Sequence, residues 1–309
     1  MKICIATSTR ADWGLLSPLA AELRRRPGVE LQILATNMHL MPEYGMTVDE
    51  IERQGFVVSA RVPMPLEGQG EAARVRAMAE CMDGTAQALR RLSPDMLVVL
   101  GDRYEMLAIA SAATVMTIPI AHIAGGEVSE GAIDDNIRHA ITKLSALHFT
   151  ATEPYRRRVI QMGEDPARVV NAGALGVWNI LNQPLMTLPE LEANLGFKFA
   201  PGRTVVATFH PVTRANESIG PMLDALDAIP GLRAIITYPN NDAGSEPIIE
   251  RIRAFAAECP DSILVVKSLG MIRYLSAVRY AAAVVGNSSS GIVEVPSLGV
   301  PTVDIGTRQ

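Results

Sequence analysis

The stretch Ala282-Ala-Val-Val-Gly-Asn-Ser-Ser-Ser-Gly-Ile-Val-Glu294 is the most informative part of this 309-residue chain for its fold. Its apolar start, residues 282–285, predicts a short buried strand that ends at Gly286. Small residues follow, and a helical pattern begins at Ile292. Small side chains leave backbone N–H groups uncovered at a helix N-terminus, where those groups and the helix dipole attract phosphate. We therefore expect a strand, an anion-binding turn and a helix.

Polar groups in and after this turn suit a nucleotide. Ser288, Ser289 and Ser290 add hydroxyl donors for a phosphate. Glu294 is expected one turn into the helix, where its carboxylate could accept hydrogen bonds from ribose hydroxyls. A serine that only caps the helix would give the same pattern, so the turn alone leaves both interpretations open.

Composition narrows the class of protein. Hydrophobic residues make up 48% and charged residues 20%, as in a globular protein, and the net charge of −5 disfavours a general nucleic-acid binder. Three distant cysteines form neither a metal-binding spacing nor a disulfide framework, which fits a reducing cytosol. The chain enters a strand at residues 2–6 with no signal peptide, and polar residues interrupt the uncharged run 106–121. We therefore predict a cytoplasmic protein.

Apolar runs alternate with helical patterns through the first half of the chain. The runs are continuous rather than alternating in polarity, which indicates a parallel sheet covered on both faces. Helical windows include 13–26, 71–92, 105–116 and 134–144. The predicted strands are 3–6, 30–35, 56–61, 96–100, 118–123, 146–150 and 169–172.

Residues 173–201, rich in glycine and proline, break this rhythm and predict an interdomain connection with a short helix around residues 189–194. Alternation then restarts, which gives an α/β protein with two doubly wound domains, 1–172 and 202–309. The chain stops only four residues after residue 305, whereas such a domain normally closes with a helix, so we expect its C-terminal end to be missing. The strands predicted for the second domain are 204–209, 232–237, 263–266, 282–285 and 302–305.

Loops that follow strands are the expected ligand sites, because doubly wound sheets bind ligands at the carboxyl ends of their strands. Arg10 follows the first strand and could reach a phosphate. The alternative is that Asp12 caps the next helix while Arg10 is solvated. Asp102 follows strand 96–100, where capping and catalysis compete as explanations.

Glu127 follows two glycines after strand 118–123 and should project from a tight loop. Asp134 and Arg138 are spaced i and i+4 on the next helix, so they can pair. A capped, salt-bridged helix would explain that pair but would not explain Glu127. His210 ends the strand at 204–209, where a following proline favours an extended backbone, and is a candidate for function.

Carboxylates and one histidine at strand ends of two domains suggest acid–base chemistry in a cleft. Metal chemistry is less favoured, because HExxH, cysteine-pair and Asp-x-Asp patterns are absent from the sequence. Walker A and Gly-x-Gly-x-x-Gly patterns are absent too, so no P-loop or nicotinamide site is indicated. His39, His122 and His148 lie in or beside apolar runs and are predicted to be structural.

Taken together, the motifs resemble the UDP-N-acetylglucosamine 2-epimerases, and most closely the hydrolysing branch that starts sialic-acid synthesis. The resemblance covers the chain in order, and the run from Asp134 to Ser145 is specific to that branch. It implies a glycosyltransferase-B-like fold with two Rossmann-like domains facing a cleft, no metal or nicotinamide cofactor, and a further helix returning towards the first domain. The motifs are Ser8-Thr-Arg-Ala-Asp12, Gly101-Asp-Arg103, His122-Ile-Ala-Gly-Gly-Glu127, Asp134 to Ser145, Gly286 to Glu294 and Gly306-Thr-Arg-Gln309.

The resemblance also implies roles for individual residues. Asp102, Glu127 and Asp134 match the catalytic carboxylates of the family, and His210 matches its cleft histidine. The spacing from Glu127 to Asp134 differs between branches, so Asp135 is a rival for the third carboxylate. Uridine diphosphate is expected on the second domain, with Arg10 reaching across from the first. The candidate nucleotide- and substrate-binding residues are Arg10, Arg138, Ser288, Ser289, Ser290, Gly291, Glu294 and Arg308.

The chemistry of the implied reaction suits this set. The C2 hydrogen of the sugar has no adjacent carbonyl to acidify it, so cleavage of the C1–O bond must come first and create an oxocarbenium-like centre. A carboxylate then removes the C2 proton, and water and a proton add back with inversion to give N-acetylmannosamine and UDP. Which carboxylate performs which step stays open, because burial and coupling set their pKa values.

Several alternatives remain at this stage. The substrate could be a related UDP- or GDP-2,4-diacetamido sugar of the legionaminic or bacillosamine type, because few contacts decide sugar identity. A non-hydrolysing 2-epimerase, a glycosyltransferase of the same fold and a non-catalytic nucleotide-sugar sensor are the others. We expect a nucleotide-sugar partner and a homodimer or homotetramer, without nucleic acid or membrane.

Overall fold

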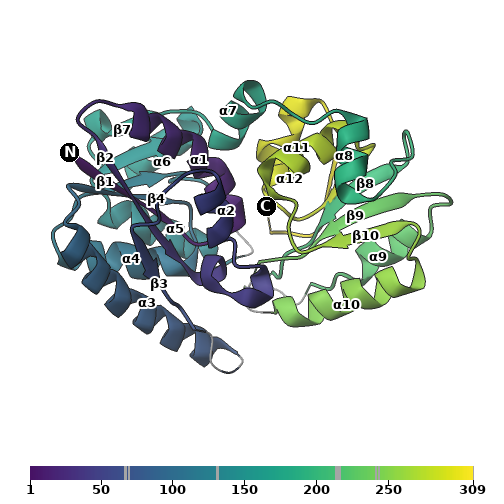
Figure 1. Cartoon of the computed structure of the whole chain (residues 1–309), viewed down its shortest axis with the longest axis horizontal. Helices are drawn as coiled ribbons and strands as arrows, with labels where there is room; N and C mark the ends of the chain where they lie inside the picture. Colours follow the sequence, from purple (N-terminus) through teal and green to yellow (C-terminus); the bar gives the residue numbers. More distant parts are fainter. Residues whose placement is uncertain are drawn as a thin grey trace. The chain divides into compact units, whose positions relative to one another are not determined.

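A computed structural model describes residues 1–65, 68, 70–129, 132–212, 217–240, 242 and 244–308 (Figure 1). Gln309, quoted in the last motif, lies outside the described residues. The chain forms two compact units. The first comprises Met1–Val128 and Asp134–Leu175, and the second comprises Ser129–Ile133 and Gly176–Gln309.

The first unit contains a seven-stranded parallel sheet with the order β3-β2-β1-β4-β5-β6-β7. The chain moves outward from β1 to β3 on one side and from β4 to β7 on the other. The direction of winding therefore changes between β1 and β4. The strands are β1 (Lys2–Thr7), β2 (Glu30–Thr36), β3 (Ala60–Val62), β4 (Met96–Leu100), β5 (Ile120–Ile123), β6 (Leu147–Thr150) and β7 (Val169–Asn171).

Helices cover both faces of this sheet, as its continuous apolar strands require. Residues of α1 and α2 pack on one face, and residues of α3, α4 and α5 pack on the other. The α-helices are α1 (Arg10–Arg25), α2 (Val48–Arg53), α3 (Glu71–Leu92), α4 (Tyr104–Val115), α5 (Asp134–Leu144) and α6 (Glu153–Gln161). The 3-10 turns are η1 (Asn37–Leu40), η2 (Pro42–Tyr44) and η3 (Pro166–Arg168).

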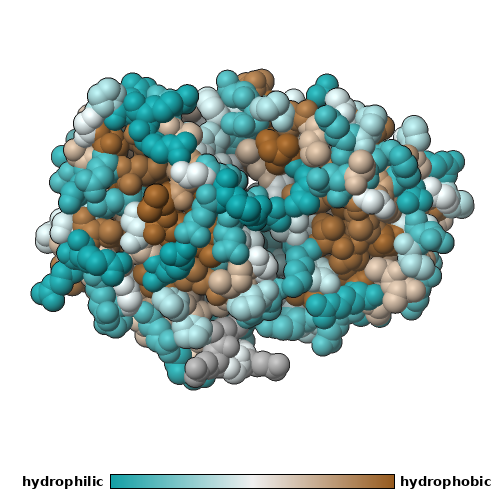
Figure 2. Space-filling view, viewed as in Figure 1, coloured by the Kyte–Doolittle hydropathy of each residue, from teal (hydrophilic) through white to brown (hydrophobic). Residues whose placement is uncertain are grey.

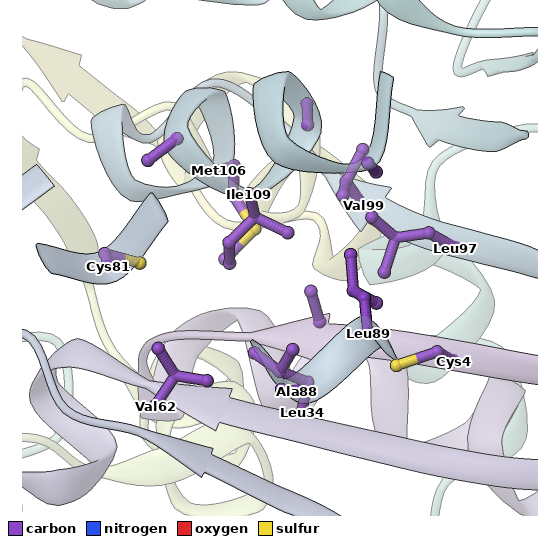
Figure 3. Packing of buried hydrophobic residues seen from close by; sticks show 14 of the residues in the cluster. Cys4, Leu34, Val62, Cys81, Ala88, Leu89, Leu97, Val99, Met106 and Ile109 are labelled. Atoms are coloured by element: carbon purple, nitrogen blue, oxygen red, sulfur yellow. The ribbon is translucent and has the colours of Figure 1, made fainter. Parts of the chain in front are cut away.

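The core on the α3 and α4 face is built from aliphatic side chains of the helices and of the central strands. Figure 3 shows Leu89, Met106 and Ile109 of the two helices beside Leu97 and Val99 of β4. All five side chains are buried. Burying one such side chain contributes roughly 1.5–3 kcal/mol, so this layer holds β4, and the loop that follows it, firmly in place.

The second unit contains a five-stranded parallel sheet with the order β10-β9-β8-β11-β12, which changes direction between β8 and β11. The edge strand β10 is partly exposed, and apolar side chains reach the surface near β9 and β10 in Figure 2. The other edge strand is β12, where Val303 is 52% exposed. The strands are β8 (Thr204–Thr208), β9 (Arg233–Thr237), β10 (Ile263–Val266), β11 (Ala283–Gly286) and β12 (Thr302–Asp304).

Helices α9 and α10 pack on one face of this sheet, while α8, α11 and the turn η4 pack on the other. In the part of the chain that is described, no helix combines the length and the apolar character needed to cross a lipid bilayer. The elements are α7 (Leu175–Asn182), α8 (Leu188–Leu195), α9 (Gly220–Asp227), α10 (Ser245–Glu258), α11 (Gly270–Tyr280), α12 (Ser290–Val293) and η4 (Val295–Leu298).

The predicted α/β class with two doubly wound parallel sheets is confirmed. The strand predicted at 56–61 is shorter, because Phe56 and Val58 pack in the core outside β3. The stretch 173–201, predicted as a connection with a short helix around 189–194, holds that helix as α8 and a further one, α7, and belongs from Gly176 onward to the second unit. The reason is that Leu191 of α8 is buried in the second core, a contact that glycine and proline content does not reveal.

Gly286, at the end of β11, cannot carry a side chain. Its φ is +138°, and a Cβ there would lie 1.8 Å from the carbonyl oxygen of Thr208 in β8. Gly286→Ala should therefore lower the free energy of unfolding by about 2–4 kcal/mol, from backbone strain and steric overlap together. Urea unfolding followed by circular dichroism measures this loss.

Gly202→Ala is the matched control, because Gly202 has φ +68° and no described atom within 4 Å of an added Cβ. It carries the strain of a positive φ without the overlap and should cost only about 1 kcal/mol. Equal losses in the two variants would show that backbone strain, rather than contact with Thr208, sets the requirement for Gly286.

Candidate active site

Four of the predicted site residues lie at strand ends beside the two points where sheet winding changes direction. In the first unit, Arg10 follows β1 and Asp102 follows β4. In the second unit, His210 follows β8 and Ser288 follows β11. Crevices at such switch points are the usual ligand sites of doubly wound sheets, so each unit by itself presents one candidate ligand site.

In the first unit, carboxylates surround a buried guanidinium. The guanidinium belongs to Arg138 of α5, which is only 4% exposed. Its Nη2 contacts Oδ2 of Asp102, and its Nη1 lies 3.8 Å from Oδ1 of Asp135. Asp135 Oδ2 also lies 3.8 Å from Nε2 of His139. The sequence predicted a pair between Asp134 and Arg138. In the structure, Arg138 lies close to Asp102 and Asp135.

The double-glycine loop that carries Glu127 is tightly packed. Gly126 has φ +81°, and a Cβ there would lie 2.5 Å from the carbonyl oxygen of Tyr155. The side chain of Arg158 donates a hydrogen bond to the Gly126 carbonyl. The close packing therefore explains the glycine, and the loop presents Glu127 from a fixed backbone.

Electrostatics make Glu127 a group that can exchange a proton near neutral pH. Burial raises the pKa of Glu127 from 4.5 to about 7, with Arg138 opposing the rise and Asp102 adding to it. A carboxyl whose pKa lies near the working pH is well suited to general acid or base catalysis. Glu127, Asp102 and Arg138 therefore form one electrostatic cluster.

Asp134 and Asp135 are the first two residues of α5, and both are half-buried. Negative charge at a helix N-terminus is stabilised by the helix dipole, so either carboxylate is favourable there. Asp135 has the ion-pair contacts described above. Asp134 and Asp135 both stay candidates for the third carboxylate.

The loop after β1 is organised by Asp12, whose role as a helix cap was the alternative interpretation of the sequence. Thr9 is the N-cap of α1, and Asp12 completes a capping box from the third helical position. The Asp12 carboxylate accepts hydrogen bonds from the backbone N–H groups of Ser8 and Thr9, at 2.9 and 3.0 Å. Arg10 is not simply solvated, because its Nε lies 2.6 Å from Oε2 of Glu50.

In the second unit, the side-chain amide of Asn287 joins the two strand ends. Its Oδ1 accepts a hydrogen bond of 2.6 Å from the backbone N–H of His210, and its Nδ2 donates one of 2.8 Å to the His210 carbonyl. Asn287 is fully buried. Arg308 Nη1 donates to the Asn287 carbonyl at 3.2 Å, which brings a second candidate residue to this point. Sequence reasoning singled out His210 but not Asn287.

The serine turn leads into α12, which begins at Ser290, two residues before the predicted start. Ser289 occupies the N-cap position without a side-chain capping hydrogen bond, so it is not an ordinary serine cap. Ser288 Oγ lies 3.4 Å from the backbone nitrogen of Ser290. The Ser290 hydroxyl lies 2.8 Å from the hydroxyl of Tyr274, a residue that the sequence did not indicate.

Gly291 and Glu294 are fixed by close packing. A Cβ on Gly291 would lie 2.7 Å from Cγ2 of Thr302 in β12. A Cβ on Gly176 of α7 would lie 2.2 Å from Oε1 of Glu294, so the carboxylate rests on the backbone of that helix. Burial raises the pKa of Glu294, and a hydrogen bond from Ser290 opposes the rise.

The three histidines predicted to be structural are all buried. His39 Nε2 lies 3.0 Å from Oγ1 of Thr7, and His148 Nε2 lies 3.1 Å from Oε2 of Glu164. Among the residues that are described, no three His, Cys, Asp or Glu side chains gather closely enough to hold a metal ion.

Solved structures share this fold. The crystal structure of UDP-GlcNAc 2-epimerase from Neisseria meningitidis, bound to UDP-GlcNAc, has a TM-score of 0.80 at 17% identity, over 100% of this chain and 84% of that chain. A putative UDP-N-acetylglucosamine 2-epimerase from Listeria monocytogenes has a TM-score of 0.75 at 17% identity, over 97% of this chain and 78% of that chain. The two units are thus those of the glycosyltransferase-B-like fold.

Sequence comparison defines the family. The pattern of the UDP-N-acetylglucosamine 2-epimerases matches residues 21–309. A GDP/UDP-N,N'-diacetylbacillosamine 2-epimerase (hydrolyzing) from Campylobacter jejuni is 38% identical over 100% of this chain and 81% of its own length. The polysialic acid biosynthesis protein P7 of Escherichia coli is 37% identical over 100% of this chain and 79% of its own length. The chain belongs to the UDP-N-acetylglucosamine 2-epimerase family, which confirms the resemblance found in the sequence.

Asn287→Asp should separate the two strand ends of the second unit. The aspartate cannot donate to the His210 carbonyl, and it buries a charge in place of a neutral amide. Losing one buried hydrogen bond and leaving its acceptor unpaired costs about 1–3 kcal/mol, so we expect at least that loss in unfolding free energy. Thermal and urea unfolding measure it.

Asn194→Asp serves as the control, because Asn194 is exposed in the same unit and its Oδ1 accepts a 3.4 Å hydrogen bond from Arg273. An aspartate keeps that acceptor, so its stability should stay within about 0.5 kcal/mol of the wild type. Unchanged stability of Asn287→Asp would mean that the amide does not hold His210 in solution.

Proposed function

We propose that this chain is a hydrolysing 2-epimerase that converts UDP-N-acetylglucosamine into N-acetylmannosamine and UDP. Membership of the family supports 2-epimerase activity. The observation that carries the proposal is the cluster at the ends of β4 and β5, where Glu127 lies within the field of the Arg138–Asp102 ion pair. Such a cluster can move protons and stabilise positive charge on a sugar.

The reaction begins with cleavage of the C1–O bond, since the C2 hydrogen is not acidic before that step. Positive charge develops at C1, and carboxylates near the ring stabilise it. A carboxylate then takes the C2 proton, which leaves a glycal and free UDP. Water adds at C1 and a proton is delivered to C2 from the opposite face, so the product has the inverted C2 configuration.

We assign the proton that is delivered to C2 to Glu127. Its pKa of about 7 lets it hold a proton at neutral pH and release it during turnover. Asp102, ion-paired to Arg138, supplies negative charge beside the reacting carbons. Asp134 or Asp135 is the third carboxylate, placed at the N-terminus of α5.

The second unit is the proposed nucleotide-binding half. The turn from Ser288 to Gly291 presents hydroxyl and N–H donors to the diphosphate, and Glu294 accepts hydrogen bonds from the ribose. His210 and Arg308 border the same turn through Asn287. Two solved relatives of this fold are described as bound to UDP-GlcNAc or UDP, which supports a nucleotide-sugar substrate. Arg10 is proposed to break its ion pair with Glu50 and to bind the diphosphate.

A second substrate is favoured by the names of two relatives. The Campylobacter jejuni protein is named for both GDP- and UDP-diacetylbacillosamine, and a Legionella pneumophila relative that is 34% identical is named for UDP-N,N'-diacetylbacillosamine. A relative from Neisseria meningitidis, also 34% identical, is named for UDP-N-acetylglucosamine. The diacetamido sugars are therefore the alternative substrates, with the same chemistry at C1 and C2.

Incubation with UDP-N-acetylglucosamine in heavy water tests the reaction. Because the mechanism removes the C2 proton and replaces it from solvent, the released N-acetylmannosamine should carry deuterium at C2. Proton NMR of the product and of released UDP measures this. A parallel incubation with UDP-diacetylbacillosamine identifies the preferred sugar.

Two results would contradict the proposal. Released UDP with protium retained at C2 would indicate a simple hydrolase. An epimerised sugar that still carries UDP would indicate the non-hydrolysing branch.

Glu127→Gln should lower turnover by about 10²–10⁴, as expected for loss of a general acid. In the wild type, turnover should fall as pH rises through about 7, because Glu127 then loses its proton. That limb of the pH profile should be absent in Glu127→Gln. A wild-type limb with the opposite slope would make Glu127 the base instead.

Stability provides a second readout for Glu127. The folded state keeps the proton up to a higher pH than the unfolded state, so the stabilising contribution is full below about pH 4.5 and is lost as pH rises through about 7. The unfolding free energy of Glu127→Gln minus that of the wild type should therefore be larger at pH 8 than at pH 5. Glu153→Gln, which changes an exposed glutamate of the same unit, should show no such trend.

A further inference from the structure

His122 is a fully buried histidine that the proposed chemistry does not use. It lies in β5, the strand that leads into the double-glycine loop. Burial lowers the pKa of His122 to about 4, so its imidazole is neutral at physiological pH. A neutral imidazole has one N–H donor and one acceptor nitrogen, and its partners show which is which.

The Nε2 atom of His122 lies 2.8 Å from the carbonyl oxygen of Gly101. A carbonyl only accepts, so Nε2 carries the hydrogen and Nδ1 is the acceptor. The backbone N–H of Gly101 in turn donates to the carbonyl of Ile123, at 2.9 Å. Both backbone polar groups of Gly101 are therefore held by β5, immediately before Asp102.

The other nitrogen of the ring faces α5 and the glycine loop. The Thr142 hydroxyl, which has a single proton, donates to the carbonyl of Arg138 at 3.0 Å, one turn earlier in the helix, and its Oγ1 lies against His122 Nδ1 at 3.2 Å. A Cβ on Gly125 would lie 3.1 Å from Thr142 Oγ1 and 3.2 Å from His122 Nδ1. The backbone of the loop that carries Glu127 thus packs directly on this pair.

We propose that His122 is a positioning residue for the reaction, whose imidazole holds the Asp102 turn, the Glu127 loop and the Arg138 helix in register. The inference rests on the proposed function, because only chemistry at this cluster gives positioning an effect on rate. Three segments that are separated in sequence meet on one ring, and each of them carries a different charged member of the cluster. A phenyl ring of similar size would fill the same space but could not hold the Gly101 carbonyl.

Two replacements separate hydrogen bonding from space filling. His122→Phe keeps a ring of similar size and removes both nitrogens, whereas His122→Gln keeps an amide N–H that can reach the Gly101 carbonyl. We expect His122→Phe to lower kcat for UDP-N-acetylglucosamine by about 10–100-fold, because a shift near 1 Å in catalytic geometry has effects of this size. His122→Gln should retain most of kcat. The Kd for UDP, measured by calorimetry, should stay within about twofold in both, because a positioning residue acts on the transition state.

A second measurement needs no turnover. Carbon NMR of protein with ¹³C-labelled glutamate carboxyls follows the titration of Glu127, assigned from its absence in Glu127→Gln. The midpoint depends on the distances from Glu127 to Asp102 and Arg138, so it should move in His122→Phe and stay in place in His122→Gln. If the wild type releases no UDP, the proposed function fails, while this midpoint still decides whether His122 positions the cluster.

An unchanged kcat and an unchanged Glu127 midpoint in folded His122→Phe would overturn the inference. The inference would also be overturned if His122→Phe and His122→Gln lost kcat equally and only in proportion to their fall in melting temperature. Should His122→Phe fail to fold, Thr142→Val removes the hydroxyl beside Nδ1 at nearly constant shape, and Thr142→Ser restores it. We then expect the valine variant to lower kcat and to move the midpoint, and the serine variant to do neither.

Discussion

The buried guanidinium of Arg138 constrains the whole candidate site of the first unit. Removing an ion from water costs several kcal/mol unless opposite charges and hydrogen bonds compensate, so Arg138 requires carboxylates close to it. Asp102 and Asp135 supply them from two different elements. The contact therefore fixes the end of β4 against α5, and the same charges act on the proton of Glu127. Stability of the fold and proton affinity at the site depend on one interaction.

In the second unit, a neutral side chain rather than an ion pair holds the ends of two strands together. Two parallel strands that wind apart leave a gap at their carboxyl ends, and their loops need a bridge. The Asn287 amide provides a donor and an acceptor to a single residue, His210, so it fixes that backbone in both directions. A neutral amide avoids the desolvation cost of a buried ion. The charge beside this turn comes instead from Arg308, whose guanidinium donates to the Asn287 carbonyl.

Much of this arrangement could be predicted from the sequence, because local patterns determine it. Continuous apolar runs identified the strands, and position after a strand identified Asp102, Glu127 and His210. The partners could not be predicted, since Arg138 is 36 positions from Asp102 and Asn287 is 77 positions from His210. The packing of α8 was missed for the same reason. Burial of Leu191 depends on residues elsewhere in the second core, whereas prolines and glycines nearby indicated a linker.

The contact between Gly176 and Glu294 has a consequence for protein engineering. Links between domains usually tolerate changes in length and composition, because they face solvent and touch little else. Here Gly176, the residue at which the chain passes from the first unit into the long segment of the second, is also the residue against which the Glu294 carboxylate packs. A side chain introduced at Gly176 would displace the group proposed to hold the ribose. On the proposed function, a change at this junction would therefore also change the affinity for the nucleotide, and an engineered linker should begin before this residue.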